Sequence, residues 1–229
     1  MVKNHLKRIA TNKNWKIHKK EEKYVAKPNP GSHSMEYGFP LVLALRNILK
    51  IGRTRKEIRD ILNHREVLID GRRTKDHKKA VGLMDVISFP KIKKSYRIIL
   101  DDKGKLNIIE IDEKENKIKL NKITGKTMVG KKIQLNLFDG RNILVEKTDA
   151  KVNSSIAIEL PTQKILESFK FEKGAKILLT GGKHIGTTGT VENIEKNKLI
   201  FKNEKNEIFE TIKKHAYVVG KDKIYVKIK

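Results

Sequence analysis

The sequence predicts an α+β protein of several small domains, and three observations support this fold class. A two-helix and hairpin pattern spans residues 41–89, short β-branched runs separated by turn residues follow from Tyr96, and the first 40 residues show no sustained hydrophobic periodicity. We therefore expect an extended basic N-terminal arm (1–40) and a small two-helix plus hairpin domain (41–97). A central all-β domain (98–172) and a small C-terminal β-barrel (173–229) should follow.

The predicted arm carries nine basic and three acidic residues and ends in a segment rich in Pro, Gly and Ser. Alone it buries too little apolar surface to offset its ordering entropy, so we expect it to order only against a partner. A chain beginning near Glu36 should then keep its stability. Trp15 has two interpretations: it stacks on a base or sugar, or it pins the arm onto the folded body.

Two helices are predicted next. Residues 41–49 are mostly apolar, and we expect this helix to end near Gly52, which tolerates the left-handed conformation of helix ends. Thr54 and Glu57 have the spacing of a capping box, and the apolar positions from Ile58 to Leu62 lie on one face of the second helix.

A basic hairpin follows the second helix. Residues 67–69 read as a strand, Asp70-Gly71 as a tight turn that needs positive φ, and residues 84–89 as a last strand. Residues 41–100 hold 16 basic and 6 acidic side chains. This excess favours contact with a polyanion over the alternative of ordinary solvated charges. The candidate contact residues here are Arg46, Arg53, Arg55, Lys56, Arg59, Arg72, Arg73, Lys75, Lys78 and Lys79.

The central segment, residues 101–170, is nearly neutral, with 14 basic and 11 acidic residues, and we interpret it as mainly structural. Residues 101–104 form a turn between two strands, and Asp139-Gly140 forms another. The expected strands are residues 97–100, 106–111, 118–123, 134–138, 142–145 and 155–160.

A glycine-rich hairpin opens the C-terminal segment. Residues 175–180 and 187–194 read as strands, and the loop between them carries Lys183 and His184 at its tip. Glycines at 181, 182, 186 and 189 permit positive φ and close approach to another surface, although a purely structural turn remains the alternative. Runs at 199–202, 208–212, 216–219 and 224–228 supply the other strands of a small closed barrel.

Composition identifies the expected partner. The chain has 52 Lys and Arg against 27 acidic residues, a net charge of +25 and a pI of about 10.0, so nucleic acid is the expected ligand. A membrane partner is not expected, because no apolar run approaches the ~20 residues that a spanning helix needs. The absence of cysteine and of a secretory signal favours the reducing cytoplasm.

No residue pattern indicates catalysis. The seven histidines lack the spacing that places two ligands on one helix face, and the paired acids at 101–102 and 112–113 lie in expected turns. Gly181-Gly182-Lys183 lacks the remainder of a phosphate-binding loop. We expect no enzyme activity, metal, cofactor or small-molecule substrate.

The order of these motifs resembles the e-type family of small-subunit ribosomal protein four from archaea and eukaryotes. The glycine-rich hairpin looks like the KOW motif of that family. The other segments that carry the resemblance are His5 to Arg8 with Trp15, Gly31 to His33, Pro40 to Asn47, Ile69 to Gly71 and Gly82 to Ile87.

The resemblance implies a non-catalytic component of the small ribosomal subunit that binds and stabilises small-subunit rRNA beside neighbouring ribosomal proteins in the cytoplasm. It also implies that the C-terminal barrel is an SH3-like KOW domain. The bias toward Lys, Ile and Asn suggests an archaeal source, and base-specific readout should be minor. The remaining candidate rRNA contacts are Lys3, His5, Lys7, Arg8, Lys13, Trp15, Lys16, Lys183 and His184.

Two other functions remain open from the sequence. A free transcription or translation factor with a KOW barrel would share the same basic surfaces. An RNA-modifying or tRNA-charging enzyme can carry the same helix and hairpin module, but residues 101–170 offer no Asp or His set suited to catalysis.

Overall fold

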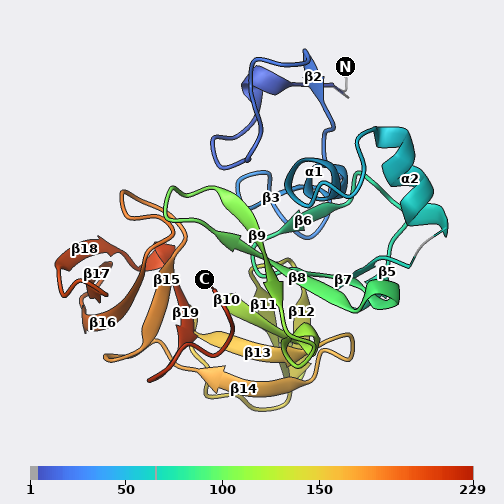
Figure 1. Ribbon diagram of the computed structural model, residues 1–229. Coiled ribbons are helices and arrows are strands. Elements are labelled where there is room, and N and C mark those ends of the chain that lie inside the picture. The colour runs from blue at the N-terminus through green and yellow to red at the C-terminus, as the bar shows by residue number, and fades with distance from the viewer. Residues whose placement is uncertain (1–4, 65, 229) are drawn as a thin grey trace. The chain divides into compact units, whose positions relative to one another are not determined.

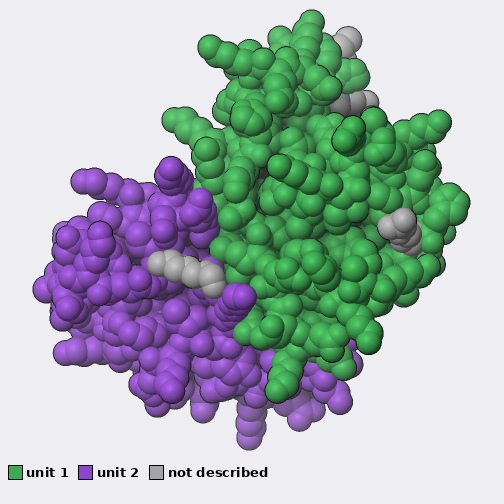
Figure 2. All heavy atoms as spheres, in the orientation of Figure 1, with its two compact units in different colours: residues 1–99, 105–117 green, residues 100–104, 118–229 purple. Residues whose placement is uncertain are grey.

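The computed structural model of the chain describes residues 5–64 and 66–228, and it is mostly β with few helices (Figure 1). It divides into two compact units (Figure 2). Unit 1 comprises Met1–Ile99 and Lys105–Lys117, and unit 2 comprises Leu100–Gly104 and Ile118–Lys229. Each unit has its own set of buried apolar side chains.

The N-terminal segment contributes to the core of unit 1. Strand β1 (Leu6–Lys7) pairs antiparallel with β2 (Tyr24–Val25), and a short 3-10 turn, η1 (Arg8–Ala10), follows β1. The Trp15 side chain is only 3% exposed, and its Nε1 donates to the carbonyls of Met35 (3.2 Å) and Gly38 (3.0 Å). The interpretation in which Trp15 pins the arm is confirmed, and a chain beginning near Glu36 would lack this buried side chain.

The first helix is irregular. Strand β3 (Gly38–Pro40) leads into α1 (Leu41–Leu43) and then into a π-helical turn, η2 (Ala44–Ile48), where the Leu49 amide donates to the Ala44 carbonyl at 3.0 Å. The left-handed residue at its end is Lys50, with φ of 54°, so the assignment of that role to Gly52 is wrong. Gly52 instead gives room to Ile58, whose Cδ1 lies 2.9 Å from where a Cβ would stand.

Helix α2 (Arg55–His64) begins with the predicted capping box. The Glu57 amide donates to Thr54 Oγ1 (3.2 Å), and the Glu57 carboxylate accepts from the Arg53 amide (2.9 Å), one residue before the expected position. The Arg53 amide, and then the Thr54 hydroxyl, which donates to Glu57 Oε1 at 2.9 Å, lower the pKa of the Glu57 carboxyl. Ile58 and Leu62 are fully buried, as the spacing predicts.

Two sheets complete unit 1. The predicted turn is confirmed, because Asp70 and Gly71 have φ of 51° and 74°. A two-stranded sheet pairs β3 with β6 (Ala80–Gly82), and a five-stranded sheet has the order β5-β4-β7-β8-β9. The strands of the larger sheet are β4 (Leu68–Ile69), β5 (Arg72–Arg73), β7 (Val86–Phe89), β8 (Lys94–Leu100) and β9 (Leu106–Ile111).

A buried His-Asp pair ties the end of the arm to this domain. His33 Nε2 lies 2.9 Å from Asp85 Oδ1, and Asp85 Oδ2 accepts from the Gly82 amide at 2.9 Å. A Cβ at Gly82 would overlap both the His33 ring and the Tyr37 carbonyl. The two separated motifs around His33 and Gly82 therefore meet at one packing contact.

Unit 2 begins with an antiparallel sheet of order β12-β11-β10-β13-β14. Its core contains Ile123, Leu135, Leu137, Ile156 and Ile158. Strand β10 continues well past the predicted end at residue 123, and β14 was not expected from the sequence. The strands are β10 (Ile118–Val129), β11 (Lys132–Leu137), β12 (Asn142–Val145), β13 (Ser155–Glu159) and β14 (Ile165–Phe169).

The second sheet of unit 2 is also antiparallel, with the order β18-β17-β16-β15-β19. The expected last strand at 224–228 is wrong, because only an isolated bridge joins Gly220 and Ile224. The strands are β15 (Lys176–Leu179), β16 (Thr188–Ile194), β17 (Lys198–Asn203), β18 (Ile208–Ile212) and β19 (Ala216–Gly220).

Lys122 joins the two sheets of unit 2 through a buried ammonium group. Its Nζ donates to the carbonyls of Lys214 (2.9 Å) and Ala216 (2.7 Å), and the residue is 5% exposed. Burial, and then the charge of Lys214, lowers the pKa of the Lys122 ammonium to about 8.

This shift predicts a pH dependence of stability. Between pH of about 8 and 10.5 the unfolded chain binds more protons at this site than the folded chain, so the unfolding free energy rises with pH in that window. Relative to Lys122→Met, the wild type should gain about 2 kcal/mol from pH ~7 to ~10. Denaturant unfolding of both proteins at both pH values measures this difference, and a constant difference would contradict the lowered pKa.

Candidate nucleic-acid interface

A groove with a volume of about 610 Å³ opens on unit 1 where the N-terminal strands meet the helical region. Its charged wall holds five Lys and Arg side chains and one carboxylate, that of Glu22. The lining residues are His5, Leu6, Glu22, Tyr24, Val25, Ala26, Lys27, Val42, Arg46, Arg53, Thr54, Arg55 and Lys78. This balance of charge suits a polyanion.

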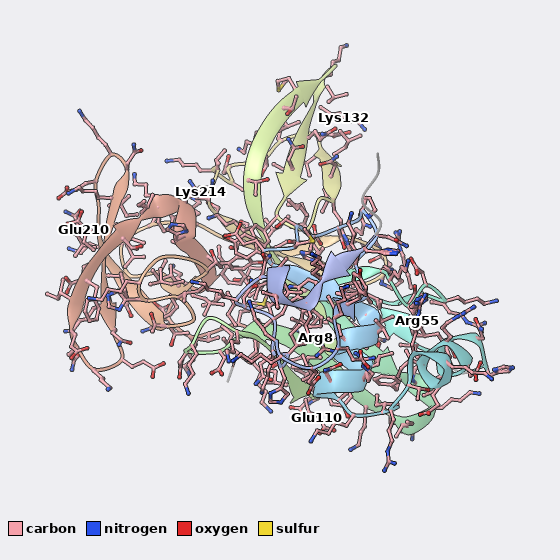
Figure 3. All side chains as sticks on the ribbon, turned by 90° about the horizontal axis from the view of Figure 1, so that it is seen from above. Arg8, Arg55, Glu110, Lys132, Glu210 and Lys214 are labelled. Carbon is pink, nitrogen blue, oxygen red and sulfur yellow. The ribbon has the colours of Figure 1, made fainter. Side chains whose placement is uncertain are left out.

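Local structure positions the arginines of the groove. Arg46 lies on η2, and its Nε donates to the side-chain amide oxygen of Asn47 at 3.0 Å. Arg55 lies in the first turn of α2, and its Nε donates to His77 Nε2 at 2.9 Å (Figure 3). Burial, and then the charge of Arg55, lowers the pKa of His77, which keeps this nitrogen an acceptor. These two hydrogen bonds orient the arginine side chains that line the groove.

The structure brings together five of the residues predicted from sequence, His5, Arg46, Arg53, Arg55 and Lys78, in this groove. Sequence reasoning missed Tyr24 and Lys27. The sequence does indicate a strand here, because Tyr24-Val25 is a short β-prone pair between Lys23 and Lys27. The neighbouring residues do not show that this strand would face the helices.

Most other predicted residues of unit 1 lie outside the groove with side chains that reach solvent. Arg73 Nη2 donates to the Asn63 carbonyl (3.2 Å), and Lys16 Nζ donates to Asn107 Oδ1 (3.2 Å). These residues are the exposed Lys7, Lys13, Lys16, Lys56, Arg59, Arg72, Arg73 and Lys75, and the half-buried Lys79. Their contact with RNA stays a prediction.

Two predicted contacts need correction. Arg8 is 2% exposed, and its guanidinium donates to the Glu21 carboxylate (2.6 Å) and the His18 carbonyl (2.8 Å), so it is engaged inside the arm (Figure 3). Trp15 is buried as described above, and its ring cannot stack on a base. Lys3 lies outside the described residues.

The glycine-rich loop of unit 2 packs closely on its own chain. A Cβ at Gly181 would overlap the His215 ring, one at Gly186 would overlap the Asp101 carbonyl, and one at Gly189 would stand 2.7 Å from the Lys202 carbonyl. The three glycines therefore allow a close approach of the backbone to another surface, as predicted. At these three positions that surface is part of the protein itself. Lys183 at the tip is exposed, and the half-buried His184 ring packs against Phe209, with centroids 4.1 Å apart and planes tilted by 33°.

Gly186→Ala tests this structural role. Gly186 has φ of +85°, and Gly174 has nearly the same φ, +87°, but nothing lies within 4 Å of a Cβ placed there. Gly174→Ala should lower the free energy of unfolding by about 1–2 kcal/mol, because alanine adopts a positive φ less readily than glycine. Gly186→Ala should lower it by roughly 1–3 kcal/mol more, because its Cβ also clashes with Asp101. Chemical unfolding measures both, and equal losses would contradict the packing interpretation.

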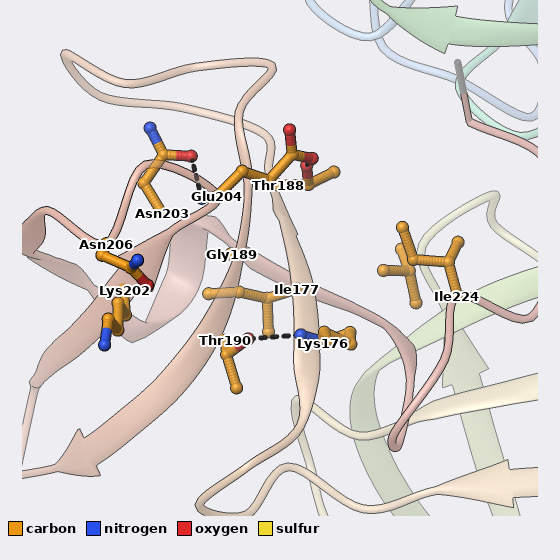
Figure 4. Close-up of a pocket in the computed structure, with 11 residues that line it drawn as sticks. Lys176, Ile177, Thr188, Gly189, Thr190, Lys202, Asn203, Glu204, Asn206 and Ile224 are labelled. Atoms are coloured by element: carbon orange, nitrogen blue, oxygen red, sulfur yellow. Dashed lines mark hydrogen bonds between the residues drawn. The ribbon is translucent and has the colours of Figure 1, made fainter.

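A second pocket, of about 240 Å³, lies on the second sheet of unit 2 (Figure 4). Four of its polar side chains pair with one another: Lys176 Nζ donates to Thr190 Oγ1 (2.7 Å), and Thr188 Oγ1 donates to Glu204 Oε1 (2.6 Å). Within residues 5–64 and 66–228, no group of three or more His, Asp or Glu is placed to hold a metal ion. Over the same described ranges, the helices are too short and too polar to cross a membrane.

Comparison with protein families adds independent information. Three family models match consecutive parts of the chain: the RS4NT (NUC023) domain at residues 2–36, the S4 domain at 41–87, and ribosomal family S4e at 92–165.

Individual proteins match over almost the whole length. The small ribosomal subunit protein eS4 of Methanosphaera stadtmanae is 44% identical, over 96% of this chain and 93% of the relative. That of Archaeoglobus fulgidus is 40% identical, over 96% and 95%. The crystal structure of the 30S ribosomal protein S4e from Thermoplasma acidophilum superimposes with a TM-score of 0.69 at 32% identity, covering 80% of this chain and 95% of that one.

Proposed function

The chain belongs to the S4e family of ribosomal proteins, and from that membership we propose which of its surfaces binds rRNA. The protein is a structural component of the small ribosomal subunit that binds and stabilises small-subunit rRNA, and it is not an enzyme. The named relatives are archaeal, in line with the source suggested by composition.

The basic surface of unit 1 is the proposed main rRNA interface. The observation that carries this proposal is the groove, whose lining holds five Lys and Arg side chains and a single carboxylate, that of Glu22, which Arg8 contacts at 3.4 Å. Lys and Arg bound to phosphates release condensed counterions and let neighbouring rRNA helices approach. The interface comprises His5, Lys7, Lys13, Lys16, Arg46, Arg53, Arg55, Lys56, Arg59, Arg72, Arg73, Lys75, Lys78 and Lys79, with Lys183 and His184 as a second contact region.

The finer domain assignment is part of the same proposal. Residues 173–229 form a KOW-type SH3-like barrel, which the five antiparallel strands and the closely packed glycines support. Residues 1–40, 41–97 and 98–172 are the arm, the RNA-binding domain and the central β domain. The protein acts in the cytoplasm, next to other small-subunit proteins.

Sedimentation tests this function. In a lysate washed with high salt, the tagged chain should remain in the peak of small ribosomal subunits, because a structural component is held by many simultaneous contacts. A free RNA-binding factor would instead be released to the top of the gradient. Recovery at the top, or with large subunits, would contradict the assignment.

A further inference from the structure

On the basis of the proposed rRNA binding, we propose that the groove of unit 1 holds a single unpaired rRNA nucleotide, with its base against Tyr24 and its phosphates beside Arg46, Arg53 and Arg55. This binding mode differs from the phosphate contacts expected of a basic surface alone, because it requires one base to leave the helical stack.

The size and floor of the groove favour a nucleotide. Its volume of about 610 Å³ lies in the range of small-ligand pockets, roughly 300–1,000 Å³. Its apolar lining includes Leu6, Val25 and Val42, with Val25 and Val42 only 9% and 2% exposed. A paired RNA helix presents phosphates, ribose hydroxyls and base edges, so it would lie over the groove without filling its apolar part. An unstacked base presents an apolar face that can enter the groove and contact this lining.

Tyr24 supplies the stacking surface. Its side chain is 46% exposed, although it stands on a strand whose other residue, Val25, is buried. His5 contacts the ring in a T-shaped arrangement, with centroids 5.5 Å apart and planes at 73°, and Lys23 Nζ lies over the ring, 5.5 Å from its centroid, so a base would stack on the face opposite Lys23. Such a ring is oriented before any ligand arrives, and aromatic rings of this kind stack on bases of any sequence.

Charge selects against most other occupants. Arg46, Arg53, Arg55, Lys27 and Lys78 line the groove, and Glu22, the carboxylate on its wall, is also engaged by Arg8. Arginine forms planar, paired hydrogen bonds with phosphate oxygens. An acidic peptide would satisfy the charge but would bring no flat ring to Tyr24, so a nucleotide fits both features better.

The test uses the full-length protein and two RNA probes, a single-stranded hexanucleotide of mixed sequence and a blunt duplex. Tyr24→Ala should weaken binding of the hexanucleotide roughly tenfold at fixed salt, with an unchanged slope of log affinity against log salt, and should leave the duplex affinity unchanged. Tyr24→Phe should bind both probes as the wild type does. Ile92→Ala, at a position with similar exposure (55%) outside the groove, is the matched control.

The outcomes separate this inference from the proposed function. If Tyr24→Ala keeps the wild-type melting temperature and also binds the hexanucleotide unchanged, while the wild type still binds small-subunit rRNA, the nucleotide site is wrong and the function stands. If the wild type binds no small-subunit rRNA, the proposed function itself fails. If poly-glutamate displaces the hexanucleotide as well as RNA does and depends equally on Tyr24, an acidic chain is the occupant and the inference is overturned.

Discussion

Replacing Trp15 with alanine should lower the unfolding free energy by about 3–5 kcal/mol, the usual loss when a large buried aromatic side chain is removed. The indole is 3% exposed, and its Nε1 satisfies the carbonyls of Met35 and Gly38. The variant therefore loses apolar burial and leaves two acceptors without their donor. Urea unfolding followed by circular dichroism measures the change.

A control variant and a truncated chain make the result specific. Ile9→Ala, at a position 78% exposed in the same segment, should change the unfolding free energy by less than about 0.5 kcal/mol. A chain that begins at Glu36 should also melt at a lower temperature, contrary to the expectation from sequence, because it lacks Trp15. If both Trp15→Ala and this truncation keep the wild-type stability, the arm is not part of the folded core.

Replacing Arg46, Arg53 and Arg55 together with alanine should weaken binding to small-subunit rRNA roughly 100-fold near 0.1 M monovalent salt. Each lost phosphate contact removes about 0.7–0.9 units from the slope of log affinity against log salt, so the slope should fall by about 2–3 units. Fluorescence binding titrations at several salt concentrations give both quantities. The three residues lie together on the groove, where their charges act on the same stretch of RNA.

A second triple variant separates location from net charge. Lys94, Lys132 and Lys198 each pair with a carboxylate, at 3.7 Å from Glu110, 3.7 Å from Glu146 and 2.7 Å from Glu210, respectively. Changing these three to alanine removes the same number of charges but should alter rRNA affinity by no more than a few-fold. If this control loses as much affinity as the arginine variant, binding follows overall charge and the groove has no special role.

Features set by neighbouring residues were predictable from the sequence. The capping box of Thr54 and Glu57 and the turn at Asp70-Gly71 depend on local hydrogen bonds and local φ, and both are present. The left-handed end of the first helix was placed at Gly52 and lies at Lys50. There a π-helical turn shifts the hydrogen bonds, and no residue preference marks such a turn.

Features set by distant contacts were not predictable in the same way. Arg8 resembles a phosphate ligand in sequence, and only the folding of the arm brings Glu21 to 2.6 Å from it. Tyr24 gains its place in the groove from strand pairing with β1 and from helices that follow later in the chain. The glycines of the C-terminal loop predicted a close approach, but the sequence did not show that the protein's own Asp101, Lys202 and His215 make it.

The most direct test of the central claim, that the basic surface of unit 1 is the main rRNA interface, is cleavage of bound rRNA by a tethered iron chelate. The chain has no cysteine, so a single introduced cysteine marks one position. Asp60→Cys places the probe on α2 among the cations, and Glu167→Cys places it on β14, in the nearly neutral central segment; both positions are exposed. We predict that the probe at position 60 cleaves small-subunit rRNA several-fold more strongly than the probe at position 167. Equal cleavage, or stronger cleavage from position 167, would contradict the assignment.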